Sequence, residues 1–583
     1  MAEHTTRPEN TTEEPPTRPT PTGAEAVVAA LAAANVQHAF GVQGGAIMPV
    51  YDALYHADIR HVTMGHEQSA AHAAAAYGVV AGDPGVCLAT SGPGATNLVT
   101  GLADADMDSD PVLALTGQAP AGLMGKDAFQ EVDTRGMTDP VTKANYLAAD
   151  SDTVGDTVGE AYAMARDGRP GPTLVDLPKD STLADADRSA GVTDGLAGVG
   201  GPPTADGEAV TAAADALAGA ERPVVLSGGG VIKGEASGEL RRFAGTYGVP
   251  VVTTMPGIGT FPEDHDLAMD VAGMHGTGYA NLALQHCDVM LAVGTRFDDR
   301  LTGGVEHFAP GAEVIHVDVD PAEISKNVHA DYPLVGDAAA VLDQLTDALP
   351  RPPDAAAWRE RCRRWKETYA MAYSAPADEP LKPQFVVEAM DALTPDDTIV
   401  TTGAGQHQMW AMQYWTYRHP RTWVSSHGLG TMGYGLPAAI GARFAADDDQ
   451  SVVCFDGDGS FLMTLQELAV AVREALDITV VVLNNAAVGM VRQWQDAFFD
   501  GRRMASAYPW APAFDVLAEA FGARGVRLEA SDEVDETLRA ALDYDGPAVV
   551  DAHIDPEENV YPLVPGGGDN TKFAMNDAQL ADL

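Results

Sequence analysis

The chain has little positive charge. Its 583 residues include 35 Lys and Arg, of which 8 are Lys, against 84 Asp and Glu, for a formal charge of −49. A surface this negative repels DNA and RNA phosphates, which excludes general nucleic-acid binding. The acidic residues are spread along the chain and form no single tail. An ordinary acidic surface would explain them, as would adaptation to concentrated salt, where a Debye length of about 3 Å at 1 M screens self-repulsion. The spread favours the second explanation, so we expect a halophilic protein whose stability rises towards multimolar salt.

Paired cysteines and long apolar runs are also lacking. The four cysteines, Cys87, Cys287, Cys362 and Cys454, have no CxxC spacing, which favours free thiols over a disulfide framework or a zinc site. No stretch of about 18 apolar residues occurs, so we expect no membrane-spanning helix. Residues 1–22 are rich in Thr, Pro and Glu and lack the apolar stretch of a signal peptide, which predicts a disordered acidic tail. Together these absences predict a cytoplasmic protein.

Two seams divide the chain into segments of ordinary domain size. Gly and Pro are frequent around residues 188–206, and Pro-rich stretches at 349–383 flank a predicted helix at 355–373. We therefore expect domains at 23–190, 205–350 and 380–563, followed by a tail at 564–583 that is either disordered or closes over a ligand. In each segment, short apolar runs such as GVCLAT, VMLAVG and ITVVVL alternate with Ala-rich stretches. Such runs are typical of strands covered on both faces, so the predicted fold class is α/β, with three doubly wound parallel-sheet domains.

The strongest local signal is a strand–helix–strand unit in the third segment. The run SVVCFD ends in Gly457-Asp458-Gly459, and after a helical stretch the run ITVVVL ends in Asn484-Asn485. A right-handed crossover leaves both strand ends at one edge of the sheet, so Asp458 and Asn485 should meet. Alone, the first turn would be only a tight turn and the second only a strand end. Together, a carboxylate, an amide oxygen and flanking glycines favour Mg²⁺ with a bound diphosphate.

The pattern GDGSF…LNN resembles the thiamine diphosphate–Mg²⁺ motif of thiamine-dependent 2-oxoacid enzymes. The resemblance covers roughly residues 23–565 and implies a pyrimidine-binding, a middle and a diphosphate-binding domain. It also implies that Asp458, the Asn485 side chain and the backbone carbonyl of Ala487 ligate the metal. The runs FGVQGGAIMPVYDAL and TSGPGATNLVTGLADADMDSDPVLALTGQ closely resemble acetohydroxyacid synthase catalytic subunits, with Gln43 at a position where Pro is usual.

His66-Glu67-Gln68 precedes the Ala-rich stretch SAAHAAAAYGVVAG. On its own, Glu67 would be a first-turn carboxylate favoured by the helix dipole. The resemblance implies instead that Glu67 hydrogen-bonds the aminopyrimidine ring and activates the cofactor as a proton donor and acceptor. Met432 would pack beneath the cofactor. The full set of implied thiamine diphosphate contacts, besides Glu67, is Gly44, Gly45, Pro93, Asn97, Ala404, Gly405, Gln406, His407, Gly430, Met432, Asp458, Gly459, Ser460, Asn485, Gly489 and Met490.

Five residues are implied to act on the substrate. Phe129 and Gln130 would line the pocket, with Gln130 as a neutral donor to the substrate oxygen, and Lys179 would lie at its entrance. Arg300 would bind the carboxylate of the second 2-oxoacid, and Trp494 would favour an acceptor with one more methylene. Simpler explanations are a loop lysine, a surface ion pair with Asp298 or Asp299, and a packed aromatic ring.

The middle segment has no GxGxxG loop, and a GGG turn alone is weak support for a nucleotide site. Its motifs as a set nevertheless resemble the FAD site of the acetohydroxyacid synthases, where FAD is structural because carboligation has no net electron transfer. The implied FAD contacts are Arg169, Gly228, Gly229, Gly230, Thr254, Met255, Met274, His275, Gly276, Gly294, Arg296, Asp298, Arg300, Asp318, Val319 and Asp337.

The resemblance implies a carboligase with thiamine diphosphate, Mg²⁺ and FAD as cofactors. It would decarboxylate pyruvate and transfer the hydroxyethyl group to a second pyruvate or to 2-oxobutyrate, towards valine, leucine and isoleucine. The active site would lie between subunits of a homodimer or homotetramer, and a small regulatory subunit is a further expected partner. The alternatives are a flavin-using relative such as a pyruvate oxidase and a catalytically silent paralogue.

Overall fold

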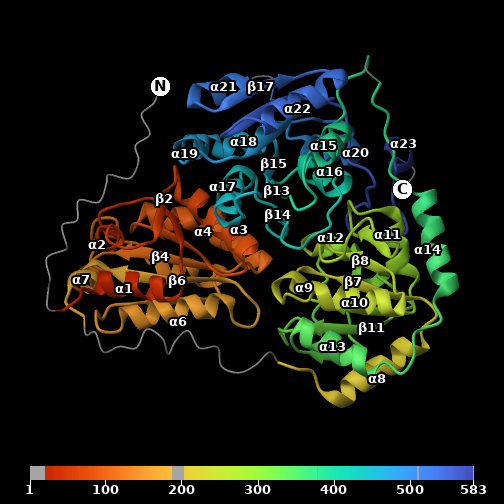
Figure 1. Ribbon diagram of the computed structural model, residues 1–583, viewed down its shortest axis with the longest axis horizontal. Coiled ribbons are helices and arrows are strands. Elements are labelled where there is room, and N and C mark those ends of the chain that lie inside the picture. Colours follow the sequence, from red (N-terminus) through yellow and green to blue (C-terminus); the bar gives the residue numbers. More distant parts are fainter. Residues whose placement is uncertain (1–19, 187–202, 377, 509–510, 582–583) are drawn as a thin grey trace.

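The computed structural model describes residues 20–186, 203–376, 378–508 and 511–581. Most of the expected tail at 1–22 and of the seam at 188–206 lies outside these residues. The described chain forms three six-stranded sheets that follow one another along the sequence (Figure 1). All the strand pairs within them are parallel, as between β3 and β4 or between β15 and β16. This confirms the prediction of three doubly wound parallel α/β domains.

The first and third sheets share one strand order. Numbered within its own domain, each reads 2-1-3-4-6-5. In spatial order the first sheet contains β2 (Arg60–Thr63), β1 (His38–Gly41), β3 (Gly85–Ala89), β4 (Val112–Gln118), β6 (Pro172–Pro178) and β5 (Ala144–Leu147). The third contains β14 (Trp423–Ser425), β13 (Ile399–Thr402), β15 (Val452–Gly457), β16 (Thr479–Asn484), β18 (Ala548–His553) and β17 (Arg524–Leu528).

The second sheet is wound differently. Read from its β9 edge, its order is 3-2-1-4-5-6, which is the order typical of dinucleotide-binding domains. The topology therefore supports a nucleotide site that the missing GxGxxG loop did not signal. Its strands are β7 (Pro223–Ser227), β8 (Val251–Thr253), β9 (Ala268–Val271), β10 (Val289–Val293), β11 (Glu313–Asp318) and β12 (Tyr332–Val335).

Helices cover both faces of each sheet (Figure 1). None of those in the described ranges combines the length and the apolar run needed to cross a bilayer. In the first domain they are α1 (Gly23–Ala33), α2 (Met48–Leu54), α3 (Glu67–Ala81), α4 (Pro93–Asp108), α5 (Thr134–Thr138), α6 (Val154–Arg166) and α7 (Lys179–Leu183). The middle domain has α8 (Gly207–Gly219), α9 (Gly229–Lys233), α10 (Ser237–Tyr247), α11 (Gly278–His286), α12 (Asp299–Thr302) and α13 (Ala338–Ala348), followed by α14 (Ala356–Thr368). The third has α15 (Pro383–Leu393), α16 (Gln406–Tyr414), α17 (Gly435–Ala445), α18 (Asp458–Thr464), α19 (Leu468–Arg473), α20 (Gly489–Phe498), α21 (Phe514–Phe521), α22 (Val534–Leu542) and α23 (Asp577–Leu580).

The Ala-rich helix α3 packs between α4 of its own domain and α17 of the third domain, in one continuous core. Small side chains allow this close approach. A Cβ at Gly441 of α17 would overlap the Ala73 carbonyl, and one at Gly101 of α4 would overlap the Ala71 side chain. The alanine pattern that predicted a helix thus also makes the interface that joins the first and third domains.

Two segments differ from the sequence expectation, and the structure describes a third, the C-terminal tail, whose state was left open. The helix predicted at 355–373 ends at Thr368. The helical stretch after Gly459 is broken by a 3₁₀ turn at Leu465–Glu467. There the buried Glu467 accepts a hydrogen bond from the Gly65 N–H of the first domain at 2.9 Å, a long-range contact that local sequence cannot reveal. The tail after residue 564 is ordered as far as it is described, because Leu563 and Ala574 exchange two backbone hydrogen bonds.

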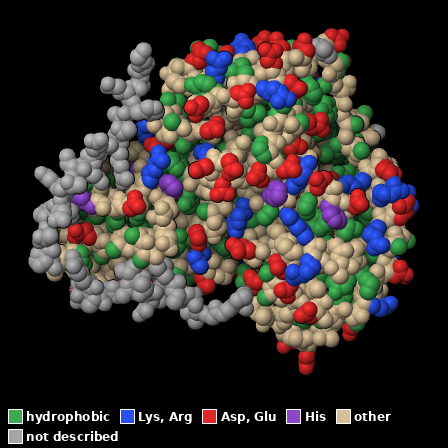
Figure 2. Space-filling view, viewed as in Figure 1, with side chains coloured by type: hydrophobic (Ala, Val, Ile, Leu, Met, Phe, Trp, Pro, Cys, Tyr) green, Lys and Arg blue, Asp and Glu red, His purple; other side chains and the backbone are tan. Residues whose placement is uncertain are grey.

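The distribution of surface carboxylates and the state of the cysteines are as expected from the sequence. Carboxylates are distributed over the whole face seen in Figure 2 and do not gather in one patch. All four cysteines are free and buried. The adaptation to salt stays a prediction.

Candidate active site

Doubly wound sheets bind ligands beyond the carboxyl ends of two neighbouring strands whose connections leave in opposite directions. In the first sheet these strands are β1 and β3, and in the third they are β13 and β15. The segments that follow them are 42–46, 90–97, 403–407 and 457–460. These four segments contain most of the residues predicted to contact thiamine diphosphate.

Asp458 connects the two predicted metal-binding turns. Its side chain is 2% exposed. One carboxylate oxygen accepts a hydrogen bond from the Gly459 N–H at 2.8 Å, and the other accepts one from the Ala487 N–H at 3.0 Å. Burial raises the pKa of Asp458 to about 7. A nearby cation would stabilise the charged form of this carboxylate.

Asn485 lies in the second of these turns. Its Nδ2 donates to Gln406 Oε1 at 3.0 Å, which leaves Oδ1 as the oxygen able to bind another group. A buried carboxylate and an amide oxygen are hard ligands that fit Mg²⁺. The described ranges contain no group of three or more His, Cys, Asp or Glu side chains able to hold a metal. A metal at this turn therefore needs further oxygens, such as the Ala487 carbonyl and a diphosphate.

Asp456 lies behind this turn, fully buried, and burial raises its pKa to about 7. The His407 Nε2 lies 3.4 Å from Asp456 Oδ1, and burial lowers the pKa of His407 to about 4. Ser460 Oγ accepts a hydrogen bond from the Gly433 N–H at 2.8 Å. Sequence reasoning missed Asp456, although an acidic residue two positions before Asp458 at a strand end was an available signal.

The remaining predicted contacts of the third domain lie around the same turn. The Met432 methyl is 3.4 Å from the position that a Cβ on Gly459 would take. Gly430 has φ +68° and open space around its Cα, so the backbone is accessible there. A Cβ on Gly489 would overlap Gln406 Oε1. Met490 packs against the third-domain core, and Ala404 and Gly405 immediately precede α16.

Glu67 is the first residue of α3 and is 9% exposed. Its Oε2 accepts a hydrogen bond from the Asn97 Nδ2 at 2.9 Å. A Cβ on Gly94 would lie 3.4 Å from its other carboxylate oxygen. The fold thus brings Glu67 together with the predicted contact Asn97. Both neighbours of the carboxylate belong to the first domain.

The glycine turn after β1 also packs against the segment after β3. A Cβ on Gly44 would overlap the Thr90 side chain, and Thr90 Oγ1 accepts a hydrogen bond from the Ala46 N–H at 3.3 Å. Gly45 has open space around it. Pro93 is exposed at the start of α4. Thr90 was not among the predicted site residues, because nothing in the local sequence indicates this contact.

The predicted pocket residues of the first domain lie near the surface. Phe129 is 87% exposed, which is unusual for a large aromatic side chain. Gln130 is half-buried at φ +55°, with its Cα 3.0 Å from the position of a Cβ on Gly92. Lys179 is half-buried at the start of α7. None of these three side chains lines either of the two cavities described below.

Arg300 and Trp494 come together although 194 positions separate them. The Arg300 guanidinium carbon lies 5.9 Å from the centre of the Trp494 ring, and Nη1 lies 3.6 Å from the exposed Asp299 carboxylate. The described part of the C-terminal tail fixes this region. Asn570 donates to the Leu301 carbonyl at 2.9 Å, and the Val564 N–H donates to the Met274 carbonyl at 2.8 Å.

A cavity of about 820 Å³ lies between the first domain and the carboxyl ends of β7 and β10. Gly228 and Gly230 pack so closely against Gly294 that a Cβ atom on any of the three would overlap backbone. The predicted flavin contacts that line the cavity are Arg169, Gly229, Gly230, Thr254, Gly294, Arg296, Asp298, Asp318, Val319 and Asp337. Those that do not are Gly228, Met255, Met274, His275, Gly276 and Arg300, and two of these, His275 and Gly276, line a second cavity of about 340 Å³.

The larger cavity has cationic side chains able to bind phosphates, together with a larger number of carboxylates. Arg169, Arg296 and Lys233 supply positive charge for phosphates, and Arg169 is held by Glu323 at 2.6 Å. Asp318 ends β11 with a pKa raised to about 6 by burial, and it could accept hydrogen bonds from ribose hydroxyls. Lys233 was missed in the sequence, because one lysine in a short helix carries no pattern.

Three family models match the chain in order. The model for the N-terminal TPP binding domain of thiamine pyrophosphate enzymes matches residues 21–137. The model for the central domain of these enzymes matches residues 210–345, and that for the C-terminal TPP binding domain matches 403–552.

Curated relatives match nearly the whole chain. The acetolactate synthase large subunit of Corynebacterium glutamicum is 44% identical over 94% of this chain and 89% of its own length. The acetolactate synthase isozyme 2 large subunit of Escherichia coli is 44% identical over 94% of this chain and 99% of its own. A probable acetolactate synthase large subunit of Methanocaldococcus jannaschii is 44% identical over 95% of each chain.

Proposed function

Since the chain belongs to the acetolactate synthase large subunits of the thiamine pyrophosphate enzyme family, we propose a specific arrangement of its cofactors and substrates. The activity joins two 2-oxoacids, with pyruvate as substrate. Thiamine diphosphate is bound by the first and third domains and supplies the electron sink that decarboxylation of a 2-oxoacid requires. We propose that Mg²⁺ binds at the Asp458 turn and that FAD binds in the cavity of the middle domain.

The hydrogen bond from the Ala487 N–H to Asp458 at 3.0 Å carries this proposal. It joins the two turns that provide a carboxylate, an amide oxygen and a backbone carbonyl. Asp458, Asn485 and Ala487 would hold the metal. The glycine-flanked turns at 403–407 and 457–460 would bind the diphosphate through backbone N–H groups.

Glu67 would hold a proton on the aminopyrimidine ring, with Asn97 orienting its carboxylate through the bond at 2.9 Å. The two neighbours described for the Glu67 carboxylate, Asn97 and Gly94, belong to the first domain, while Phe129, Gly45 and Gly430 are exposed or open. These observations support a site completed by a second chain. The proposed assembly is therefore a homodimer or a homotetramer of such dimers.

Arg300 would bind the carboxylate of the acceptor 2-oxoacid, because a guanidinium pairs with it bidentately. Trp494, within 5.9 Å of that guanidinium, would contact the acceptor side chain and favour 2-oxobutyrate. Gln130 would donate to the substrate oxygen, and Lys179 would attract the anionic substrate at the entrance. Phe129 would close the pocket once a second chain covers it.

FAD would have a structural role, because joining two 2-oxoacids transfers no net electrons. The name "large subunit" of the relatives supports a small subunit as a further partner. The decisive assay converts pyruvate to acetolactate with each cofactor omitted in turn, and then with 2-oxobutyrate added. We expect no product without thiamine diphosphate or Mg²⁺. Flavin bleaching by pyruvate under anaerobic conditions, with acetate or acetyl phosphate and no acetolactate, would contradict the proposal.

A further inference from the structure

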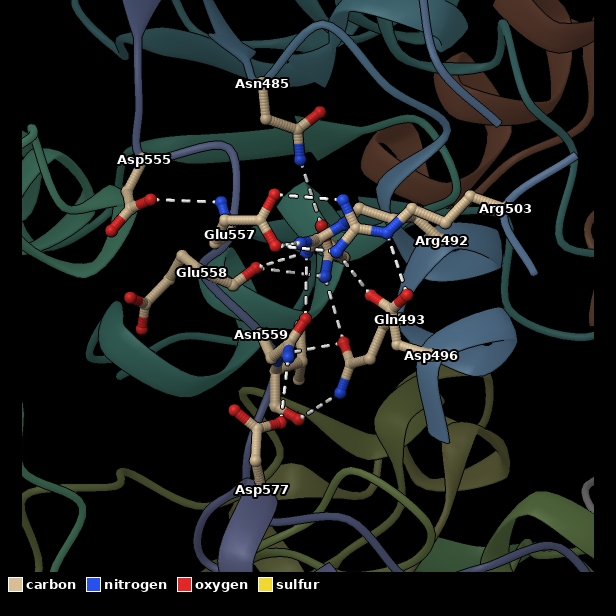
Figure 3. A network of polar contacts seen from close by, with 12 residues as sticks. Asn485, Arg492, Gln493, Asp496, Arg503, Asp555, Glu557, Glu558, Asn559 and Asp577 are labelled. Carbon is tan, nitrogen blue, oxygen red and sulfur yellow. Dashed lines mark hydrogen bonds and ion pairs between the residues drawn. The ribbon is translucent and has the colours of Figure 1, made fainter. Parts of the chain in front are cut away.

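Three side-chain amides form a chain that begins at Asn485. The Asn485 Nδ2 donates to Gln406 Oε1 at 3.0 Å, and the Gln406 Nε2 donates to Gln493 Oε1 at 2.9 Å. Gln493 then pairs with the backbone of Val560. It donates to the Val560 carbonyl at 3.0 Å and accepts from the Val560 N–H at 3.0 Å. Figure 3 labels Asn485 and Gln493 of this path within a wider polar network that joins α20 to the segment 557–560.

Val560 sets the direction of the hydrogen bonds along this chain of side-chain amides. A side-chain amide can turn by 180° and exchange its oxygen for its NH₂ with almost no change in shape. A backbone N–H and a backbone carbonyl cannot exchange. Val560 therefore determines which way Gln493 points, Gln493 determines Gln406, and Gln406 determines Asn485. At the end of the chain the Asn485 NH₂ is engaged and its Oδ1 is free.

Burial makes this directionality strong. Gln493 is 1% exposed, and Gln406 and Asn485 are also buried. Turning any one amide would place two donors or two acceptors face to face at about 3 Å, with little water to compensate. Gln406 Nε2 has one alternative acceptor, the Glu558 carbonyl at 3.3 Å.

A simpler explanation is that the network only fastens α20. Arg492 already does so, because its Nη2 donates to the Glu558 carbonyl and to Asn559 Oδ1, both at 2.8 Å. Losing Gln493 would leave these bonds in place. The amide chain can therefore be tested separately from the anchoring of the helix.

We propose that Gln406 and Gln493 are positioning residues that hold Asn485 with its oxygen, and not its NH₂, towards the metal. This inference rests on the proposed metal site. An NH₂ group cannot ligate a cation, so a turned Asn485 would remove one of the ligands. Supporting side chains of this kind typically change metal affinity by about 10- to 100-fold.

The middle domain offers a matched control. Gln344 pairs with the backbone of Ala205 in the same way, donating to its carbonyl at 3.0 Å and accepting from its N–H at 3.0 Å. Gln344 has no contact with the metal turn. Gln344→Met and Gln493→Met therefore remove the same pair of hydrogen bonds, and only the second interrupts the amide chain.

The test measures Mn²⁺, used in place of Mg²⁺, by the electron paramagnetic resonance signal of the free ion. The full-length protein is loaded with FAD and saturated with thiamine diphosphate. We expect Gln493→Met and Gln406→Met to bind Mn²⁺ about 10- to 100-fold more weakly than wild type and Gln344→Met to bind it unchanged. Gln406→Met keeps the pair between Gln493 and Val560, so it remains informative if Gln493→Met does not fold.

Repeating the measurement in an Asn485→Asp protein distinguishes a turned Asn485 side chain from a general loss of order around the metal site. In Asn485→Asp the side chain presents an oxygen either way round, so adding Gln493→Met should leave Mn²⁺ affinity unchanged. An equal loss in both backgrounds would overturn the inference, as would wild-type affinity in Gln493→Met. Failure of wild type itself to bind Mn²⁺ with thiamine diphosphate would instead overturn the proposed metal site.

Discussion

The first and third domains have the same strand order and different turn chemistry. Their sheets can be matched through a buried aspartate in corresponding strands, Asp176 in β6 and Asp551 in β18. In this match Gly41 pairs with Leu88 in the first sheet where Thr402 pairs with Phe455 in the third. The agreement extends across the sheets, so equivalent positions can be compared residue by residue.

The match aligns Ser91 with Asp458. The turn after β3 thus has a hydroxyl where the turn after β15 has the carboxylate that contacts Ala487. In the first domain the acidic residue is Glu67, after β2. One topology therefore provides two ligand-binding edges, and the turn residues decide which edge holds a metal and which holds an acid.

The segments after the fourth strand differ as well. After β4 the chain runs through an exposed loop with Phe129 and Gln130, and after β16 it enters α20, which carries Trp494. Polar contacts from Arg492 and Gln493 to residues 557–560 hold α20 in place (Figure 3). We infer that the third domain contributes a rigid wall to the substrate pocket, and the first domain a wall that a second chain completes.

The largest effect on activity is expected when the acidic residue of the first domain, Glu67, is replaced. Glu67→Gln keeps a side chain that Asn97 can contact but cannot hold or release a proton. We expect acetolactate formation to fall by about 10²- to 10⁴-fold, the usual range for general acid–base catalysis, while thiamine diphosphate affinity changes little. A product assay and calorimetric titration of the cofactor measure the two quantities. An unchanged rate would contradict the role assigned to Glu67.

The next largest effect is expected when the turn residue of the third domain, Asp458, is replaced by serine, the residue at the equivalent position of the first domain. Asp458→Ser removes the carboxylate, so Mg²⁺-dependent binding of thiamine diphosphate should weaken by about 100-fold or more, because a direct ligand is lost. Titration of the cofactor at fixed Mg²⁺ measures the change. Ser91→Ala in the first domain is the matched control and should bind normally. Equal weakening in both variants would mean that the two turns are not functionally distinct.

A smaller effect, on the choice of acceptor, is expected when Trp494 in the proposed rigid wall of the pocket is replaced. Trp494→Leu should lower the preference for 2-oxobutyrate over pyruvate by roughly 10-fold, since one methylene contact contributes about 1–3 kcal/mol. Competition between the two acceptors, with both products quantified, gives the ratio. Phe498→Leu, a half-exposed aromatic on the same helix, is the control and should leave the ratio unchanged. A preference that survives Trp494→Leu would assign selection to another residue.

The smallest expected effect is on the pH dependence of stability, in which the two matched aspartates, Asp176 and Asp551, should differ. Burial raises the pKa of Asp176 to about 6, despite hydrogen bonds from Thr116 and Gln118. Burial also acts on Asp551, but hydrogen bonds from His553 and Asn484 and the nearby His553 charge outweigh it, so its pKa is lowered. Asp176 therefore favours folding below pH ~4 and loses this contribution, at most about 3 kcal/mol, as pH rises through 6. Asp551 favours folding above pH ~4 and loses its contribution only as pH falls further.

Melting temperatures between pH 4 and pH 6 separate these cases. Relative to wild type, Asp176→Asn should gain a few degrees over this range, because its side chain no longer has to ionise. Asp551→Asn should differ from wild type by a constant amount. Parallel curves for both variants would show that the two aspartates have the same environment.

Local pattern was enough to predict the three parallel α/β domains and the GDG…NN unit. Continuous apolar runs specify buried strands, and the spacing between Asp458 and Asn485 fits a single crossover. The break in the helix after Asp458 was not predicted, because Glu467 is held by Gly65 of another domain. Asp456, Thr90, Lys233 and Gln493 were also missed, since each acquires its role from a partner distant in sequence.

The sequence by itself determined the elements, the family motifs and the chemical types of the candidate ligands, because these depend on neighbours within one strand–turn–helix unit. Only the tertiary structure decided that Arg300 meets Trp494, that a cavity of about 820 Å³ separates the first and middle domains, and that Val560 orients Asn485 through two glutamines. Such contacts depend on how sheets and helices pack, and packing is a property of the whole chain.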